Sequence, residues 1–231
     1  MAVSRGARRI GILASGGGSN LQALIDHFGG GSAAGGVARG PERGVGEIVW
    51  VGANRPDAGA LGRASRAGIA SAVVTDTENG DAFFAGLEAA GVELLVLAGY
   101  LKRVPAAVVR AFHGRMVNVH PALLPSFGGT GMYGRHVHEA VIAAGVTVTG
   151  VTVHWVNDEY DRGAIIAQWP VSVLEGDTPA TLAARVLHVE HRLYPLCVAG
   201  VARGTIILGP DGRTHGRPGE IHHDFASLLP P

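Results

Sequence analysis

The first half of the chain alternates short apolar runs with amphipathic segments, and this alternation constrains the fold more than any other feature. The apolar runs are predicted strands, at residues 9–14, 47–52, 69–74, 92–98 and 115–120. The segments between them are predicted helices, at residues 21–28, 59–67, 81–90 and 106–112. Strands separated by helices pair in parallel through right-handed crossovers. We therefore expect an α/β protein with a mostly parallel twisted sheet and helices on both faces.

The second half follows a different pattern. Residues 146–156 alternate polar and apolar side chains, and a second extended run at 164–169 follows an acidic turn, so we expect an antiparallel strand pair there. Asp177-Thr178-Pro179 supplies a cap and a first-turn proline for a long helix. Cys197 continues the apolar stripe of that helix and is predicted to lie in the core. Beyond residue 203 we expect a short strand and turn, followed by a polar segment.

The composition indicates a globular chain of 231 residues, with 47% hydrophobic and 16% charged residues. Lys plus Arg and Asp plus Glu number 19 each, so no basic excess indicates a nucleic-acid surface. No apolar run reaches the roughly 18 residues that a membrane-spanning helix needs. The single cysteine excludes an internal disulfide and fits a reducing compartment. With no recognisable signal peptide, we expect a cytoplasmic protein with no membrane or nucleic-acid partner.

A glycine turn, Ser15-Gly16-Gly17-Gly18-Ser19-Asn20, joins the first predicted strand to the first predicted helix. Small residues let a ligand approach the backbone, and the N–H groups and dipole at a helix N-terminus attract an anion. The dinucleotide fingerprint is absent because its third glycine would fall on Leu21, and no Gly-Lys-Ser/Thr of a Walker loop follows. The turn therefore favours a monophosphate ligand. The alternative is a tight strand–helix turn that binds nothing.

Two polar side chains end the central predicted strand. Asn118 and His120 lie two residues apart, so they project from one face, and Pro121 ends the strand. An amide beside an imidazolium suits a developing oxyanion, whereas the alternative is a polar strand end that caps a loop. One carboxylate of the acidic turn is a candidate to reach His120 and raise its pKa, unless the turn is simply exposed. The sequence does not choose among Asp158, Glu159 and Asp161.

Three further ionisable residues have an open interpretation. Glu190 lies off the apolar stripe of the long helix and faces either a site or solvent. His136 and His138 lack the partner spacing of a metal site, so no metal is expected. These two histidines are predicted to gate the site or to cap a helix.

Four segments, in this order, resemble the folate-dependent phosphoribosylglycinamide formyltransferases: GILASGGGSNLQAL, VLAGYLKRV, NVHPALLPSFGG and TVHWVNDEYDRGAIIAQ. The third segment is typical of the wider formyltransferase superfamily, and the first is typical of the glycinamide ribonucleotide enzymes within it. The resemblance as a whole covers about residues 8–203 and implies a Rossmann-like formyltransferase fold. A single domain at 1–203 is expected, with a nucleotide-binding half (8–113), a folate-binding half (114–203), and a C-terminal strand and polar tail (204–231). We expect a monomer or a homodimer.

The resemblance implies roles for individual residues. The catalytic residues would be Asn118, His120 and Asp161. Glycinamide ribonucleotide would be held by Gly18, Ser19 and Asn20 at its phosphate, by Glu190 at its ribose, and by Pro121. The co-substrate 10-formyltetrahydrofolate would lie against Leu101, Lys102, Arg103, Val104, Asn118 and Asp158.

The activity implied is transfer of a formyl group from 10-formyltetrahydrofolate to the amine of glycinamide ribonucleotide, in de novo purine biosynthesis. Asn118 and a protonated His120 would stabilise the oxyanion, and Asp161 would keep His120 charged. Two alternatives stay open. One is a formyltetrahydrofolate hydrolase, and the other is a non-catalytic domain that binds a phosphate ligand.

The chain departs from this family in three places. Leu101-Lys102-Arg103-Val104 stands where Met-Arg-Ile-Leu is common, so backbone contacts there are expected to survive better than side-chain contacts. Asn79-Gly80-Asp81 stands where many members carry an arginine, whose contact must be replaced or absent. The glycine-rich segment 29–46 is longer than usual and is predicted to be a surface loop without chemistry.

Overall fold

The computed structural model describes residues 6–29, 40–42, 44–75 and 80–218. Seven strands form one sheet in the order β3-β2-β1-β4-β5-β6-β7. Their bounds are Arg8–Ala14 (β1), Gly46–Ala53 (β2), Ala70–Val73 (β3), Leu94–Leu97 (β4), Met116–His120 (β5), Val148–Trp155 (β6) and Ile165–Ser172 (β7). The helices are Ser19–Phe28 (α1), Gly59–Arg66 (α2), Asp81–Ala89 (α3), Ala106–Ala111 (α4), Arg135–Ala143 (α5) and Pro179–Arg203 (α6).

The pairing of the strands divides the sheet into two parts. Strands β3, β2, β1, β4 and β5 are parallel, whereas β6 is antiparallel to both β5 and β7. This confirms the predicted α/β fold with a mostly parallel sheet and an antiparallel pair in the second half. The chain leaves β1 toward β2 on one side and later enters β4 on the other. Open α/β sheets bind ligands at such a reversal, beyond the carboxyl ends of the strands.

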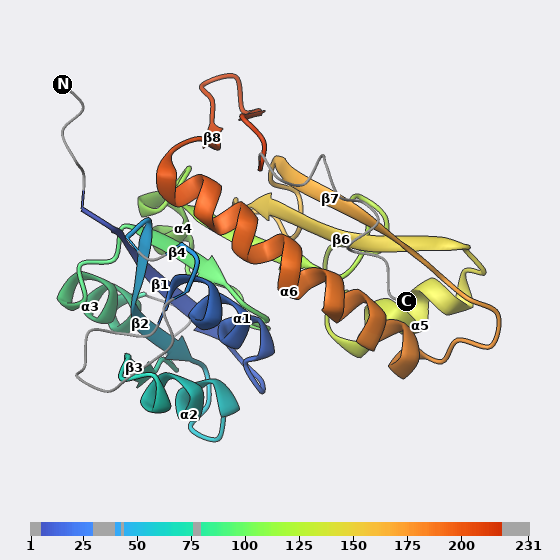
Figure 1. The fold of residues 1–231 in the computed structure, drawn as a ribbon, viewed down its shortest axis with the longest axis horizontal. Coiled ribbons are helices and arrows are strands. Elements are labelled where there is room, and N and C mark those ends of the chain that lie inside the picture. Colours follow the sequence, from blue (N-terminus) through green and yellow to red (C-terminus); the bar gives the residue numbers. More distant parts are fainter. Residues whose placement is uncertain (1–5, 30–39, 43, 76–79, 219–231) are drawn as a thin grey trace.

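Helices cover both faces of the sheet, and adjacent residues of one strand supply both cores. Ile12 of β1 packs in the core beneath α1, α2, α5 and α6, and its neighbour Leu13 packs in the core beneath α3 and α4. This two-sided burial explains why the strands read as continuous apolar runs. Figure 1 shows α6, the longest helix, running beside α1 and across one face of the sheet.

Helix α6 begins as its sequence predicts. Thr178 caps it, because the side-chain oxygen accepts from the N–H of Thr181 and the Thr181 side chain returns the contact. The helix ends at Gly204, which adopts the left-handed conformation (φ 76°) that favours glycine. Cys197 is fully buried, as expected for a core residue. No helix in the described part of the chain has the length and hydrophobicity needed to cross a membrane.

The segment after α6 forms a short hairpin of β8 (Ile207–Leu208) and β9 (Thr214–His215). The indole N–H of Trp155 donates to the Thr214 hydroxyl, which in turn donates to the Ile165 carbonyl. These bonds attach the hairpin to β6 and β7. Much of the predicted surface loop (residues 30–39 and 43), Asn79, and the polar tail from residue 219 lie outside the described residues.

Tyr194 ties α6 to the two central strands. Its buried hydroxyl lies 2.8 Å from the carbonyl oxygen of Leu97 on β4 and 3.1 Å from that of Val117 on β5. We expect Tyr194→Phe to lower the free energy of unfolding by about 1–3 kcal/mol, because the buried carbonyls lose a donor. Urea denaturation measures this change. Tyr133→Phe, at an exposed tyrosine, is the control, and equal stability of both variants would contradict the role of Tyr194.

Candidate active site

A cavity of about 740 Å³ lies beyond the carboxyl ends of β4 and β5, a volume typical of small-molecule sites. Its walls come from the loop after β4, the end of β5, the loop before α5, the acidic turn after β6, and the first half of α6. The structure brings most of the predicted site residues to this cavity. These are Asn20, Leu101, Lys102, Arg103, Val104, Asn118, His120, Pro121, Asp158, Asp161 and Glu190.

Two of the predicted residues do not line the cavity. Gly18 and Ser19 lie at the start of α1, outside its walls, and Ser19 borders a second surface pocket between α1 and α6. The glycine turn is nevertheless joined to the cavity wall. The Ser15 N–H donates to the Gly99 carbonyl, and the Leu101 N–H donates to the Ser15 hydroxyl, so the loop after β4 is tied to the turn after β1.

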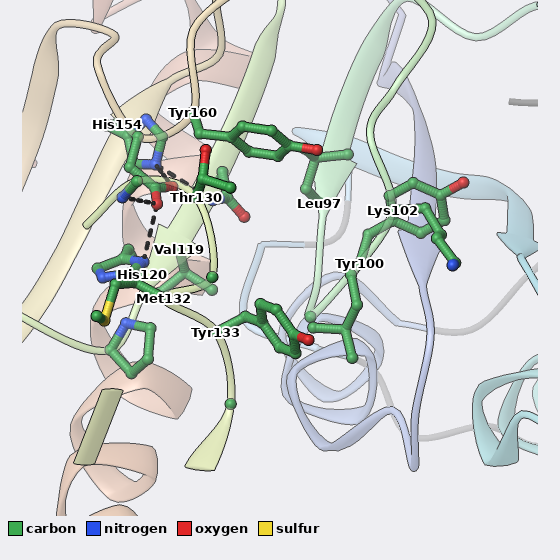
Figure 2. A pocket seen from close by; sticks show the side chains of 18 of the residues that line it. Leu97, Tyr100, Lys102, Val119, His120, Thr130, Met132, Tyr133, His154 and Tyr160 are labelled. Carbon is green, nitrogen blue, oxygen red and sulfur yellow. Dashed lines mark hydrogen bonds and ion pairs between the residues drawn. The ribbon is translucent and has the colours of Figure 1, made fainter. Parts of the chain in front are cut away.

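Figure 2 shows His120 and His154 together on one side of the cavity, with Tyr100 and Lys102 on the opposite side. Asn118 and His120 both line it, as their spacing on β5 predicted. His120 is buried, and one oxygen atom lies near each nitrogen of its imidazole. Nε2 lies 2.8 Å from the Phe127 carbonyl oxygen, and Nδ1 lies 3.6 Å from Oδ2 of Asp161. A carbonyl only accepts, so a neutral ring carries its proton on Nε2 and presents bare Nδ1 to Asp161.

Asp161 is the carboxylate of the acidic turn that reaches His120, whereas Asp158 and Glu159 are exposed. Its Oδ2 also accepts from the Gly129 N–H at 2.9 Å, and its Oδ1 lies 3.6 Å from Nε2 of His154. Burial acts to raise the pKa of Asp161, but the contacts with His154, His120 and Gly129 together lower it. Asp161 is therefore ionised at neutral pH.

The backbone is strained at two residues that touch His120. Phe127 and Asp161 have φ of 54° and 55°, and no other non-glycine residue in the described ranges has positive φ. This conformation is costly for a side chain other than glycine, and it recurs at functional sites. Phe127 directs its carbonyl at one nitrogen of His120, and Asp161 directs its carboxylate at the other.

The Asp161 carboxylate acts to raise the pKa of His120, as expected, but the net shift of that pKa is downward. Burial lowers the pKa of His120, the Asp161 carboxylate and the Phe127 carbonyl raise it, and nearby His154 lowers it again. The net direction is downward, because removing the imidazolium from water outweighs a single carboxylate at 3.6 Å. The imidazole of His120 is therefore neutral at neutral pH.

His154 is part of this cluster, and the sequence reasoning missed it. It pairs with Asn118 across β5 and β6, and its side chain is buried. Nδ1 donates to the Trp155 carbonyl at 2.8 Å, so a neutral ring can accept from the Asn118 amide nitrogen, which lies 3.2 Å from Nε2. The alternation of residues 146–156 already placed His154 on one face of its strand, but only the register of β5 against β6 places it beside Asn118.

Glu190 faces the cavity and not solvent, which decides between its two interpretations. Its carboxylate accepts from the Asn20 side-chain amide at 2.6 Å, and both side chains are buried. Burial raises the pKa of Glu190 to about 7, and the Asn20 amide opposes that rise. The Asn20 side-chain amide is therefore engaged with Glu190 through its nitrogen.

The remaining candidates differ in their surroundings. His138 is buried and lines the cavity, and burial and nearby His120 lower its pKa. His136 is exposed and contacts Glu139 within α5, so it does not gate the cavity. Arg103 donates to the Asp158 carbonyl at 3.2 Å, which links two walls of the cavity. Within the described ranges, no group of three or more His, Cys, Asp or Glu side chains could hold a metal ion.

The fold and the cavity define a class of protein, which comparison with known proteins identifies. The family model for formyl transferases matches residues 8–198. The chain therefore belongs to the formyl transferase family.

Within this family, the chain is similar to proteins named phosphoribosylglycinamide formyltransferase. The chain is 38% identical over 212 residues to the chloroplastic phosphoribosylglycinamide formyltransferase of Arabidopsis thaliana, covering 89% of this chain and 69% of that protein. It is 40% identical over 211 residues to the trifunctional purine biosynthetic protein adenosine-3 of Bos taurus, covering 89% of this chain but 19% of that protein. The crystal structure of phosphoribosylglycinamide formyltransferase from Anaplasma phagocytophilum matches with a TM-score of 0.78 at 35% identity, covering 91% and 94% of the two chains. The family predicted from the sequence is confirmed.

The Asp161 contact generates a titration prediction. We expect Asp161→Asn to lower the pKa of His120 further, because the carboxylate that favours the imidazolium is removed while burial remains. Asparagine tolerates positive φ, so the turn keeps its shape. NMR titration of the His120 ring measures the shift. Asp158→Asn, at an exposed carboxylate with no ion pair to His120, is the control; an unchanged or raised pKa in Asp161→Asn would refute the assignment.

Glu190 generates a stability prediction. Because its pKa rises on folding from the ordinary 4.5 to about 7, the folded protein holds a proton that the unfolded chain has released. Its stability therefore falls as pH rises through that window. Glu190→Gln has no group that titrates there, so its free energy of unfolding should not show this fall. The difference in free energy of unfolding between the variant and the wild type should therefore increase by on the order of 3 kcal/mol from about pH 5 to pH 8. Urea denaturation at the two pH values tests this prediction. The same change in unfolding free energy with pH in both proteins would rule it out.

Proposed function

We propose that the protein transfers a formyl group from 10-formyltetrahydrofolate to the amine of glycinamide ribonucleotide. One observation carries the proposal: Asn118, His120 and Asp161 converge on a cavity that extends to Asn20 and Glu190, beside the glycine turn. Such a cavity can hold an amine nucleophile and a formyl donor together, with polar groups at the point of transfer. The names of the relatives support the same nucleotide substrate.

The nucleotide would occupy the end of the cavity near α1 and α6. The N-terminus of α1 offers backbone N–H groups and a positive dipole to the phosphate, with Gly18, Ser19 and Asn20 at its start. The Glu190 carboxylate, fixed by the Asn20 amide, would accept hydrogen bonds from the ribose hydroxyls. Ionised Glu190 is the better acceptor, so binding through the ribose is expected to strengthen as pH rises through about 7.

The folate would occupy the opposite end. Residues 99–104 form one wall, where Val104 is buried, Leu101 exposes 48% of its surface and Lys102 extends outward. The apolar part of this wall suits a planar ring, and the Lys102 ammonium suits the carboxylates of the folate tail. Asp158 lies on the other wall, and its backbone carbonyl accepts a hydrogen bond from the Arg103 side chain.

The reaction proceeds by direct attack. The amine nitrogen forms a bond to the formyl carbon, and the carbonyl electron pair moves to oxygen. The Asn118 amide donates to this oxyanion, while bare Nδ1 of His120 takes the proton that the amine releases. The resulting imidazolium is stabilised by ionised Asp161 and by the oxyanion. When the tetrahedral intermediate collapses, the bond to N10 breaks and the proton passes to N10, so His120 returns to its neutral form.

One assay separates this reaction from its two alternatives. The protein is mixed with 10-formyltetrahydrofolate, with and without glycinamide ribonucleotide, and deformylated folate is followed by absorbance. Formyl transfer requires the nucleotide. Formate release without the nucleotide would indicate a hydrolase, and nucleotide binding without any absorbance change would indicate a binding domain.

Two substitutions test the assigned roles. We expect Asn118→Ala and His120→Ala each to lower kcat by ~10²–10³, because each removes a group that acts on the tetrahedral intermediate. Equilibrium binding of the nucleotide should stay close to that of the wild type. His113→Ala is the matched control, since this histidine is exposed and lies outside the cavity. A variant with near-normal turnover would remove its residue from the mechanism.

A further inference from the structure

The glycine turn is held by α2 through two of its carbonyl groups. The Gly16 carbonyl accepts from the Ala60 N–H at 3.2 Å. The Gly17 carbonyl accepts from Nε of Arg63 at 2.7 Å, and Nη1 of the same guanidinium donates to the Gln22 side chain at 3.0 Å. Arg63 therefore bridges the turn before α1 to the first turn of α1 itself.

The backbones of α2 and of the glycine turn are in direct contact. A Cβ on Gly18 would lie 2.8 Å from Cα of Ala60, and a Cβ on Gly59 would lie 3.1 Å from Cα of Gly17. Gly18 also has φ of 74°, which favours glycine. These contacts leave the turn no room to move toward α2, and Arg63 supplies the side chain that holds one of its carbonyls there.

Holding a carbonyl fixes the direction of the next N–H. In a trans peptide the C=O and N–H bonds point in opposite directions, so carbonyls of Gly16 and Gly17 that face α2 turn the N–H groups of Gly17 and Gly18 away from it. Among the described residues, no group accepts from the N–H of Gly17, Gly18 or Ser19. Three donors are thus presented together and unsatisfied, with a guanidinium behind them.

We propose that Arg63 is a positioning residue for the nucleotide phosphate, because it locks the Gly17 carbonyl and so aims the N–H groups of the glycine turn at the phosphate oxygens. This inference rests on the proposed function, since it assumes that the turn binds the phosphate of the acceptor nucleotide. In this proposal Arg63 acts through the Gly17 carbonyl that it holds. A planar guanidinium reaches Gly17 and Gln22 at once, which an ammonium cannot do with the same geometry.

The kinetic test compares Arg63→Ala, Arg63→Lys and wild type with glycinamide ribonucleotide and with the same compound lacking its phosphate. We expect Arg63→Ala to raise KM for the phosphorylated substrate by about tenfold, the effect of one charged hydrogen bond. The kcat, the KM for 10-formyltetrahydrofolate, and kcat/KM for the dephosphorylated substrate should change by less than about twofold, since none depends on the phosphate. Arg63→Lys should recover part of the loss by keeping the charge.

Arg66→Ala is the matched control, because Arg66 lies one turn further along α2, is exposed, and contacts neither the turn nor Gln22. An unchanged KM in Arg63→Ala would overturn the inference. So would an equal loss with phosphorylated and dephosphorylated substrates, which would indicate a general structural defect.

A binding measurement separates failure of this inference from failure of the proposed function. Inorganic phosphate is titrated into wild type and Arg63→Ala while the amide signals of Gly17, Gly18 and Ser19 are followed by NMR. The inference is supported if phosphate shifts these signals in the wild type and shifts them much less in Arg63→Ala. This holds even if the wild type transfers no formyl group. Equal responses in both proteins, or no response in either, reject it whatever the enzyme assay gives.

Discussion

The contact between the His120 imidazole and the Asp161 carboxylate depends on two strained loops that meet at the end of β5. Phe127 and Asp161 both adopt positive φ, and each directs a backbone or side-chain oxygen at one nitrogen of the same ring. The ring is buried, so its charged form is costly without these oxygens. The consequence is a neutral imidazole with an ionised carboxylate close to one of its nitrogens. In the reaction that we propose, this ring would accept the proton of the attacking amine, and Asp161 would stabilise the resulting charge.

The rest of the fold brings this cluster to a cavity that Asn20, the last residue of the glycine turn, also lines. The parallel half of the sheet places the carboxyl ends of β1, β4 and β5 at one edge, because successive crossovers return the chain to the same end. The antiparallel strand β6 then adds His154 beside Asn118. Helix α6 completes the cavity, since Glu190 lines it while Tyr194, four residues on, anchors the helix to β4 and β5. One helix thus links the proposed ribose contact to the sheet core.

Electrostatics in the cavity differ from what residue types alone suggest. A histidine beside an aspartate predicts a raised pKa, but the pKa of His120 is lowered because burial dominates. A glutamate in a helix predicts an ordinary acid, yet the pKa of Glu190 rises to about 7. In both cases the decisive quantity is loss of water around the charged form, which depends on the packing of distant segments. Asp161 is the opposite case, since its hydrogen bonds and nearby histidines outweigh its burial.

The sequence by itself determined the strand and helix alternation, the glycine turn, the shared face of Asn118 and His120, and the core position of Cys197. Each of these depends on the local periodicity or backbone chemistry of a few neighbouring residues. Only the tertiary structure decided that Asp161 and not Asp158 or Glu159 reaches His120, and that Glu190 faces the cavity. It also decided that His154 lies beside Asn118 and that Arg63 contacts the glycine turn. These contacts join residues that are 36 to 170 positions apart in the sequence, so they depend on strand register and helix packing. Periodicity carries no information about such distances, because it specifies which way a side chain points but not what lies opposite it.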